Sequence, residues 1–494
     1  TLRNYANEIV DIDGNGISNQ EAIIEMIDVS WIRIEGLRIH NSIMNDAKGI
    51  LIEGKCNNIS ILNNEIYDIH FSNNPNFPVS DTTNAQPLIV YGTDPNSPVE
   101  NLLIQGNTIH NSRTGYSEAL AVNGNVANFQ ITGNIVHDIS NIGIDIIGHE
   151  GTCPDSTRDQ ARQGLVNSNT VYRCIANYAT SAGIYVDGGM QINVENNTLY
   201  HNGYGIEIGC EKIGKTASQV NVRNNVAYDN EVAGLSLGGF DYPNGSGAVV
   251  NAIVRNNTFY SNNFGNTGVG ELYLTYCDNC LLQNNIFYPS AQNTLVVGEN
   301  VPQTLTMRYN LTFSAGGSSG LNYDWNGTTI SGFIAFQMAT AQEANSLFAD
   351  PLFVAASITN PDFHISSSSP VVDAGDPNTI VSILETDLDG LARVEGSYID
   401  IGADEYNVPA EREDFADKIA YVLFPNPAIE MLFLEKEKGG GQPVYSLFNL
   451  QGEKLASGRF PKYGLSVSEF SRGIYLIKLE NRRGEIVTQR IWVD

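Results

Sequence analysis

Residues 183–214 read GIYVDGGMQINVENNTLYHNGYGIEIGCEKIG and contain the repeating unit of the chain. The stretches 183–187 and 205–208 alternate between apolar and other side chains, as strands with one buried face do. A third short alternation, at 192–194, lies between them and leads into the pair Asn196-Asn197. The stretch predicts three short strands per coil of a chain that stacks on itself.

The same phrase recurs over the first 310 residues, each time with an asparagine at the equivalent position. Successive asparagines lie 25 to 35 residues apart, with one interval of 43: Asn64, Asn107, Asn134, Asn169, Asn197, Asn225, Asn257, Asn285 and Asn310. A period of this length indicates a solenoid, and short strands with Gly and Asn corners favour a parallel β-helix over helical repeats. Asparagine tolerates left-handed backbone and can bond its counterpart on the next coil. We predict an all-β chain with a parallel β-helix over residues 1–406 and its asparagines stacked at one corner.

The longer intervals contain extra residues that must leave the coil as loops. They fall at 70–98, 149–165, 209–218, 239–248 and 262–270. Several follow the Gly-Ile-x-Ile strand directly, so we expect them to gather on one side and wall a groove, above all the loops at 149–165 and 239–248.

A closing segment, residues 301–406, is predicted to cap the coil. It includes one short helix expected at 334–347, followed by TDLDGLAR at 386–393 and IDIGADEY at 399–406. This series resembles the end of many secreted bacterial right-handed β-helix proteins of the pectin-lyase-like, carbohydrate-active kind, which implies a right-handed, single-stranded coil. Asp387-x-Asp389-Gly390 matches the start of a calcium loop but lacks the later glutamate, which favours a simple turn.

Residues 407–418 are polar and predict a linker to a second β unit at 419–494. Three motifs in this unit, Phe424-Pro-Asn-Pro427, Asn449-Leu-Gln-Gly452 and Ser471-Arg-Gly-Ile-Tyr475, resemble the C-terminal sorting domain of the Bacteroidetes type IX secretion system. The resemblance implies an immunoglobulin-like β-sandwich, recognition by that machinery, and a secreted or cell-surface protein. No signal peptide opens the chain, so we expect that an export signal has been removed.

Charge and motifs exclude several functions. With 55 acidic against 27 basic residues, the net charge of −28 disfavours nucleic acid and anionic membranes as partners. No apolar run approaches the roughly 20 residues of a membrane span, and no Walker A, GxGxxG or GxSxG motif is present. Six cysteines include one CxxC pair, Cys277 and Cys280, without a second pair or histidines at ligand spacing. We therefore expect the cysteines to be buried thiols or to form a local disulfide, and we do not expect a zinc site among them. Separately, we expect the protein to be a monomer.

Aligning the glycine of each Gly-Ile-x-Ile strand places four side chains in one outward column: Asp145, Tyr185, Glu207 and Ser236. Asp187 lies one outward position along. From the strand spacings, the backbones of Asp187 and Glu207 are roughly 8 Å apart. Two carboxylates at this distance suit glycoside cleavage, where one acid stays protonated and the other ionised.

We therefore predict a glycoside hydrolase with Asp187 and Glu207 as catalytic residues and Glu211 in reserve. The segment from Tyr185 to Glu207 is similar to β-helical glycoside hydrolases of the β-xylosidase type, which implies Asp187 as nucleophile and Glu207 or Glu211 as acid/base. The expected substrate-binding residues are Asp145, Tyr185, His149, Asp241, Tyr242, Lys212, Lys215 and Tyr273.

Two alternatives stay open for the same groove. A polysaccharide lyase would use Lys212 or Lys215 as base and Ca²⁺ to neutralise a uronate carboxylate. A glycan-binding adhesin would use the aromatic and polar side chains without turnover. The acidic balance makes a polyanionic substrate less natural, so the hydrolase ranks first.

Overall fold

The computed structural model describes residues 1–494 except 6–7, 19–20, 383–384, 408–420, 426–427, 437–441, 450–452, 481–485 and 494. The chain divides into two compact units, one formed by Thr1–Thr379 and Thr386–Tyr406, the other by Ile380–Glu385 and Asn407–Asp494. The predicted linker lies outside the described residues apart from Asn407.

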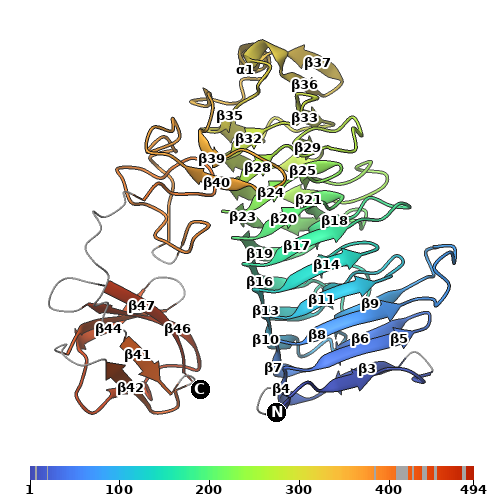
Figure 1. The fold of residues 1–494 in the computed structure, drawn as a ribbon, viewed down its shortest axis with the longest axis vertical. Coiled ribbons are helices and arrows are strands. Elements are labelled where there is room, and N and C mark those ends of the chain that lie inside the picture. The colour runs from blue at the N-terminus through green and yellow to red at the C-terminus, as the bar shows by residue number, and fades with distance from the viewer. Residues whose placement is uncertain are drawn as a thin grey trace. The chain divides into compact units, whose positions relative to one another are not determined.

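The first unit is a parallel β-helix built from three long sheets (Figure 1). Sheet A contains, in pairing order, β1 (Leu2–Arg3), β4 (Ser30–Glu35), β7 (Asn57–Leu62), β10 (Val99–Gln105), β13 (Val126–Thr132), β16 (Arg162–Asn167), β19 (Met190–Glu195), β23 (Asn221–Arg223), β27 (Ile253–Arg255), β31 (Leu281–Gln283) and β34 (Thr306–Arg308), with β22 (Thr216–Ser218), β26 (Ala248–Val250) and β30 (Cys277–Asp278) beside it. Sheet B contains β2 (Asp11–Asp13), β5 (Arg38–Ile43), β8 (Glu65–His70), β11 (Thr108–Ser112), β14 (Ile135–Ile139), β17 (Thr170–Cys174), β20 (Thr198–Tyr200), β24 (Val226–Tyr228), β28 (Thr258–Tyr260), β32 (Ile286–Tyr288), β35 (Leu311–Thr312) and β38 (Leu347–Phe348). Sheet C contains β3 (Ala22–Ile27), β6 (Ala47–Glu53), β9 (Ala85–Gly92), β12 (Leu120–Gly124), β15 (Ile144–Ile147), β18 (Ala182–Asp187), β21 (Tyr204–Gly209), β25 (Ala233–Leu237), β29 (Leu272–Leu274), β33 (Thr294–Gly298), β36 (Asn322–Trp325) and β37 (Thr328–Ser331).

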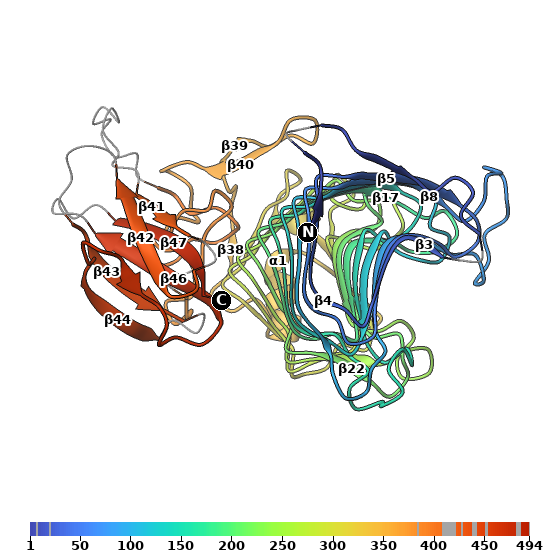
Figure 2. The ribbon, with the colours of Figure 1, turned by 90° about the horizontal axis from the view of Figure 1, so that it is seen from below.

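The interior of the coil is apolar because alternate side chains of every strand point inward. Ile184, Val186, Ile206 and Ile208 are fully buried there, as the alternation predicts. Viewed from below, successive coils superimpose around this core (Figure 2). The fold class predicted from the repeat is confirmed.

The asparagine ladder is also confirmed. At the corner between sheets A and B, the backbone N–H and side-chain Nδ2 of Asn169 both donate to Oδ1 of Asn197, at 2.9 and 3.0 Å. The same pattern joins each pair of successive ladder asparagines from Asn64 to Asn310. Each buried amide thus has partners on the coils before and after it, which removes the cost of burying it.

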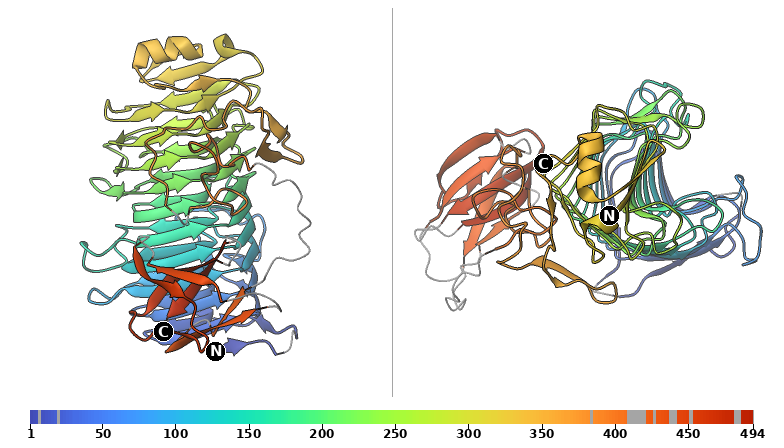
Figure 3. Two further views of the ribbon diagram at one scale, coloured as in Figure 1. Left: turned by 90° about the vertical axis from the view of Figure 1, so that its left-hand side faces the viewer. Right: turned by 90° about the horizontal axis from the view of Figure 1, so that it is seen from above.

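The end of the coil is covered by the helix α1 (Phe333–Thr340) and the short 3-10 turn η1 (Ser318–Gly320) (Figure 3). The predicted helix, 334–347, was too long. The helix stops at the left-handed residue Ala341, because the chain then rejoins the coil through a bond from the Tyr309 N–H to the Ala344 carbonyl.

The closing segment then runs back along the outside of sheet B. Its hairpin, β39 (Phe353–Ala355) and β40 (Asp362–Ile365), packs an apolar face of Phe363 against Tyr228 and Tyr260. Arg393 is fully buried and pairs with Glu405 at 2.8 Å. Asp387, Asp389 and Gly390 form the predicted turn, closed by a bond from the Gly390 N–H to the Asp387 carbonyl.

The second unit is a β-sandwich of two antiparallel sheets around a core of its own. One sheet contains β41 (Tyr421–Phe424), β42 (Met431–Lys436) and β45 (Leu465–Ser466). The other contains β44 (Lys454–Arg459), β43 (Val444–Phe448), β46 (Gly473–Glu480) and β47 (Ile486–Val493).

The structure also bears on two expectations, the state of the cysteines and the absence of a membrane span. All six cysteines are free, buried thiols, one of the two forms expected. Within the described ranges, no helix has the length and apolar character that crossing a bilayer requires.

Candidate functional site: an acidic pocket on sheet C

The predicted outward column exists on sheet C. Its register pairs Asp145 with Tyr185, Tyr185 with Glu207, and Glu207 with Ser236. Asp187 pairs with Gly209, two residues beyond Glu207. The repeat thus orders the side chains correctly, although it does not show which of them border open space.

A pocket of about 570 Å³ opens at the Asp145 end of this column and extends along the earlier coils of sheet C. Residues preceding sheet C strands contribute one wall, among them Asn84, Tyr116 and Thr180, while Glu150 and Glu211 follow strands at the other ends. Six carboxylates line it: Asp46, Glu118, Asp145, Glu150, Asp187 and Glu211. Lys48 is the one basic side chain in that lining, counted over the described residues. Such a site attracts cations or protons, because like charges at close range resist ionisation.

Asp145 is the most enclosed of these acids. It lies on β15 with 3% of its surface exposed, and its Oδ1 atom has no hydrogen-bond partner among the described residues. Burial raises the pKa of Asp145 well above its usual range, and the charges of Glu118, Asp187 and Glu211 raise it further. The surroundings of Asp145 therefore favour its protonated form.

Asp187 differs from Asp145 in one contact. It ends β18 and is 4% exposed, but its Oδ1 accepts a hydrogen bond of 2.7 Å from the Glu211 N–H. Burial and the charge of Glu211 raise the pKa of Asp187 well above its usual range, as at Asp145, and this N–H is the contact that acts in the opposite direction. The contact favours the ionised form, so of the two acids Asp187 is the better candidate for the carboxylate.

Two of the three predicted catalytic acids line the pocket, and the third does not. Asp187 and Glu211 border it, whereas Glu207 lies beyond its edge, half-buried. Burial and the charge of Glu211 raise the pKa of Glu207 to about 8. Tyr185 separates Glu207 from Asp145 in the column and packs in an apolar cluster with Ile142.

The predicted cationic partners lie elsewhere. Lys212 is exposed and Lys215 half-buried, and neither is part of the pocket lining. His149 is half-buried next to Glu150, and burial, followed by the charge of Lys215, lowers its pKa. The lysines instead belong to the loop after β21, whose turn closes through a bond from the Lys215 N–H to the Lys212 carbonyl.

The loop at 239–248 does not wall the pocket, contrary to its expected place. Asp241 is exposed on it, and Tyr242 stacks on Tyr276 with ring centroids 4.0 Å apart. Tyr273 continues the column two coils above Glu207 and donates to Glu299 at 3.1 Å. These residues lie on later coils, because the pocket lining runs from β6 to Glu211 after β21, whereas Asp241 follows β25 and Tyr273 is on β29.

The sequence argument missed Glu118 and Lys48. Burial raises the pKa of Glu118 to about 7, and the charge of Glu211 adds to this. Glu118 precedes β12, where Ala119 replaces the glycine used to align the strands, and Ala121 pairs with Asp145. Strand alternation alone would have extended the column to β12 and brought Glu118 into view.

The comparisons with known proteins concern the coil and the second unit. The family described as "Right handed beta helix region" matches residues 99–259 and 159–334. The Bacillus subtilis (strain 168) protein YwoF is 32% identical over 387 residues, which cover 75% of this chain and 79% of YwoF. The chain belongs to the same protein family as YwoF.

The second unit matches the family described as "Secretion system C-terminal sorting domain" over residues 422–494. This family member is therefore secreted or held at the cell surface, as its C-terminal motifs predict. Two solved structures are similar to this chain at low identity. Pectate lyase Pel9A is 14% identical over 82% of this chain and 97% of its own, with a TM-score of 0.43. The Dettilon tailspike protein is 14% identical over 71% and 63%, with a TM-score of 0.44.

Proposed function

We propose that the protein is a carbohydrate-active enzyme that hydrolyses glycosidic bonds in the acidic pocket of sheet C. The observation that carries this proposal is a pair of buried acids among the pocket-lining residues: Asp145, whose Oδ1 has no hydrogen-bond partner in the described structure, and Asp187, whose Oδ1 accepts the Glu211 N–H. Two acids in such unequal surroundings are what glycoside cleavage requires.

Asp145 is assigned as the general acid. Its proton passes to the glycosidic oxygen as the bond from the anomeric carbon to that oxygen breaks. Asp187 is assigned as the carboxylate that either attacks the anomeric carbon or removes a proton from the attacking water. The two residues are on neighbouring coils and displaced by two positions, so their Cα atoms are roughly 8 Å apart, and their carboxyl groups can approach the about 5 to 9 Å used in such reactions.

Lys48 supports a second candidate, uronate β-elimination. It is the only basic group in the described lining of a pocket whose other charged groups are all carboxylates. An oxygen-only donor set suits calcium, which when bound would neutralise the substrate carboxylate. Lys48 would then act as the base that accepts the proton from the carbon next to that carboxylate. Lys212 and Lys215 do not line the pocket, so neither is assigned this role.

A glycan screen tests both proposals. The full chain is incubated with neutral and uronic polysaccharides, with and without EDTA. Two signals are followed: the release of reducing ends, and the absorbance at about 235 nm that unsaturated uronates give. Hydrolysis is expected to release reducing ends without the absorbance and to survive EDTA. If the absorbance rises and EDTA abolishes the rise, the reaction is elimination and the hydrolysis proposal is wrong. If a glycan binds but no product forms, the protein is a glycan-binding protein and not an enzyme on that glycan.

A further inference from the structure

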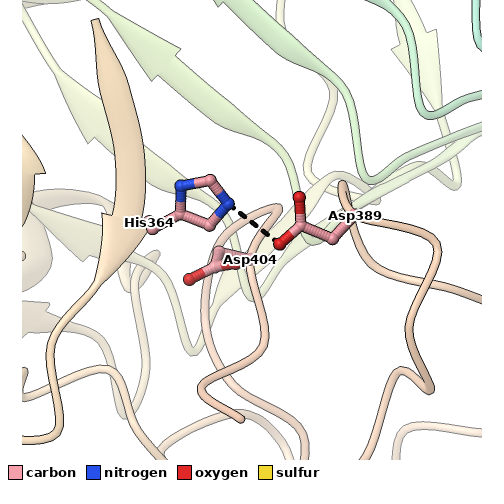
Figure 4. Close-up of side chains that lie close together, drawn as sticks. All are labelled: His364, Asp389 and Asp404. Atoms are coloured by element: carbon pink, nitrogen blue, oxygen red, sulfur yellow. Dashed lines mark hydrogen bonds and ion pairs between the residues drawn. The ribbon is translucent and has the colours of Figure 1, made fainter. Parts of the chain in front are cut away.

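A second group of ionisable side chains lies on the closing segment, far along the chain from the acidic pocket. His364 on β40, Asp389 in the turn after Thr386, and Asp404 near the end of the coil unit converge there (Figure 4). Their ligand atoms all lie within 4.8 Å of one another. A zinc ion bound at 2.0–2.2 Å would set its ligands at most ~4.4 Å apart, so only small side-chain movements separate this arrangement from coordination.

The histidine is already oriented as a metal ligand would be. Its Nδ1 atom is 2.5 Å from Oδ1 of Asp362, and its Nε2 atom faces Oδ2 of Asp389 at 2.9 Å. A carboxylate on one ring nitrogen fixes the tautomer and directs the other nitrogen at the metal, an arrangement common around ligating histidines. Asp404 is held in place because its Oδ2 accepts the Ile365 N–H at 2.8 Å.

A further buried carboxyl group lies in the turn that carries Asp389. Asp387 has no exposed surface, and its Oδ2 atom has no hydrogen-bond partner in the described structure. It opens the turn that carries Asp389, where its Oδ1 caps two backbone N–H groups. A buried, unsatisfied carboxylate oxygen is costly unless a proton or a cation compensates it.

We propose that His364, Asp389 and Asp404 bind a divalent metal ion that fastens the closing segment. One imidazole with two carboxylates matches zinc, which accepts mixed nitrogen and oxygen ligands, better than calcium, which prefers oxygen alone. The ligands come from three separate stretches of the segment, so the ion would join the hairpin, the turn and the irregular stretch at 399–406. Its role is structural, and it lies apart from the proposed catalysis.

The test is zinc binding by the full chain. After treatment with a chelator and buffer exchange, zinc chloride is titrated in by calorimetry and the melting temperature is measured with and without it. We expect one equivalent of zinc per chain and a higher melting temperature when it is bound. Asp389→Asn, at a side chain that is 43% exposed and so tolerates replacement, should weaken zinc affinity at least 10-fold. Asp362→Asn should weaken it about 10- to 100-fold through the imidazole.

Asp229→Asn is the matched control. It removes the carboxylate partner of His201, 2.8 Å away, at a pair outside the three-residue cluster, and it should leave stoichiometry and affinity unchanged. Failure of the wild-type chain to bind one equivalent would overturn the proposal, and so would zinc affinity that Asp389→Asn does not alter. Calcium binding as tight as zinc binding at this site would overturn the choice of metal.

Discussion

The asparagine ladder and the acidic pocket both contain buried polar groups, but they treat them in opposite ways. Asn197 is 1% exposed, and its amide bonds the coils on either side, to Asn169 and to Asn225. Asp145 is 3% exposed, and one of its oxygens bonds to nothing in the described chain. Satisfied buried groups specify the architecture, whereas unsatisfied ones are retained at a cost in stability. Asp145 is thus a buried group that the fold keeps at a cost in stability, whereas Asn197 is one that holds successive coils together.

The sharpest test of this contrast replaces the pocket acids by their amides. Asp145→Asn and Asp187→Asn should each lower turnover on a confirmed substrate by about 10²–10⁴-fold, because each removes a proton-transfer or nucleophilic group. The melting temperature should hardly fall, since an amide keeps the shape of each buried side chain and the acceptor oxygen that Asp187 offers to the Glu211 N–H. Asp324→Asn, at a distant position of the same column, serves as control. Near-normal turnover in both pocket variants would remove the assignment.

The ladder should respond in the opposite sense. Asn197→Ala leaves the Asn169 N–H and the Val166 carbonyl without their partner, which costs about 2–4 kcal/mol of unfolding free energy. Activity below the melting temperature should persist. Asn193→Ala, which removes one half-buried contact to Asn221, should cost less than about 1 kcal/mol in the same denaturation experiment. Equal losses in the two variants would contradict a special role for the ladder.

The pH dependence of stability separates the pocket from ordinary ion pairs. Glu118 has a folded pKa of about 7 against an ordinary value of 4.5, so between these values the folded chain binds more protons than the unfolded one. Its contribution is complete below about pH 4.5 and is lost as pH rises through 7. The melting temperature should therefore fall between pH 5 and pH 8, and less steeply in Glu118→Gln.

Asp138 provides the control for that titration. Its hydrogen bonds to Arg173 lower its pKa to about 2, so it is ionised in both states over this range. Asp138→Asn should shift the melting temperature by a similar amount at pH 5 and pH 8. A slope unchanged by Glu118→Gln would show that this acid is not buried as described.

The smallest expected effect distinguishes the acid pair predicted from the sequence, Asp187 and Glu207, from the pair assigned in the pocket, Asp145 and Asp187. Glu207→Gln should change turnover by less than a few-fold, because Glu207 lies outside the pocket lining. The same assay as for Asp145→Asn measures it. A loss as large as that of Asp187→Asn would restore the original pair of Asp187 and Glu207.

The coil and the order of its outward side chains could be predicted because both follow from periodicity. Asn169, Asn197 and Asn225 recur at the interval of one coil, and the glycine alignment put Asp145 and Glu207 in the right register. The pocket could not be predicted in this way, because the loops that wall it do not follow the repeat. The sequence gives no sign that Tyr116 and Thr180 border the column, or that the loop carrying Asp241 does not. The closing segment was also beyond reach in detail, since the meeting of His364 with Asp404 depends on packing against sheet B.

The ladder has a consequence for the way the chain acquires its shape. Its bonds join residues 25 to 43 positions apart, so a new coil needs only the preceding coil as a template. Formation can advance along the chain in sequence, without bringing distant ends together. The closing segment is the exception: Asn196 bonds to Thr386, 190 residues away, so this contact can form only after many coils are in place. A chain that emerges from a membrane one end first could thus form its coils one after another as it emerges. The closing segment would pack against the outside of the coil last.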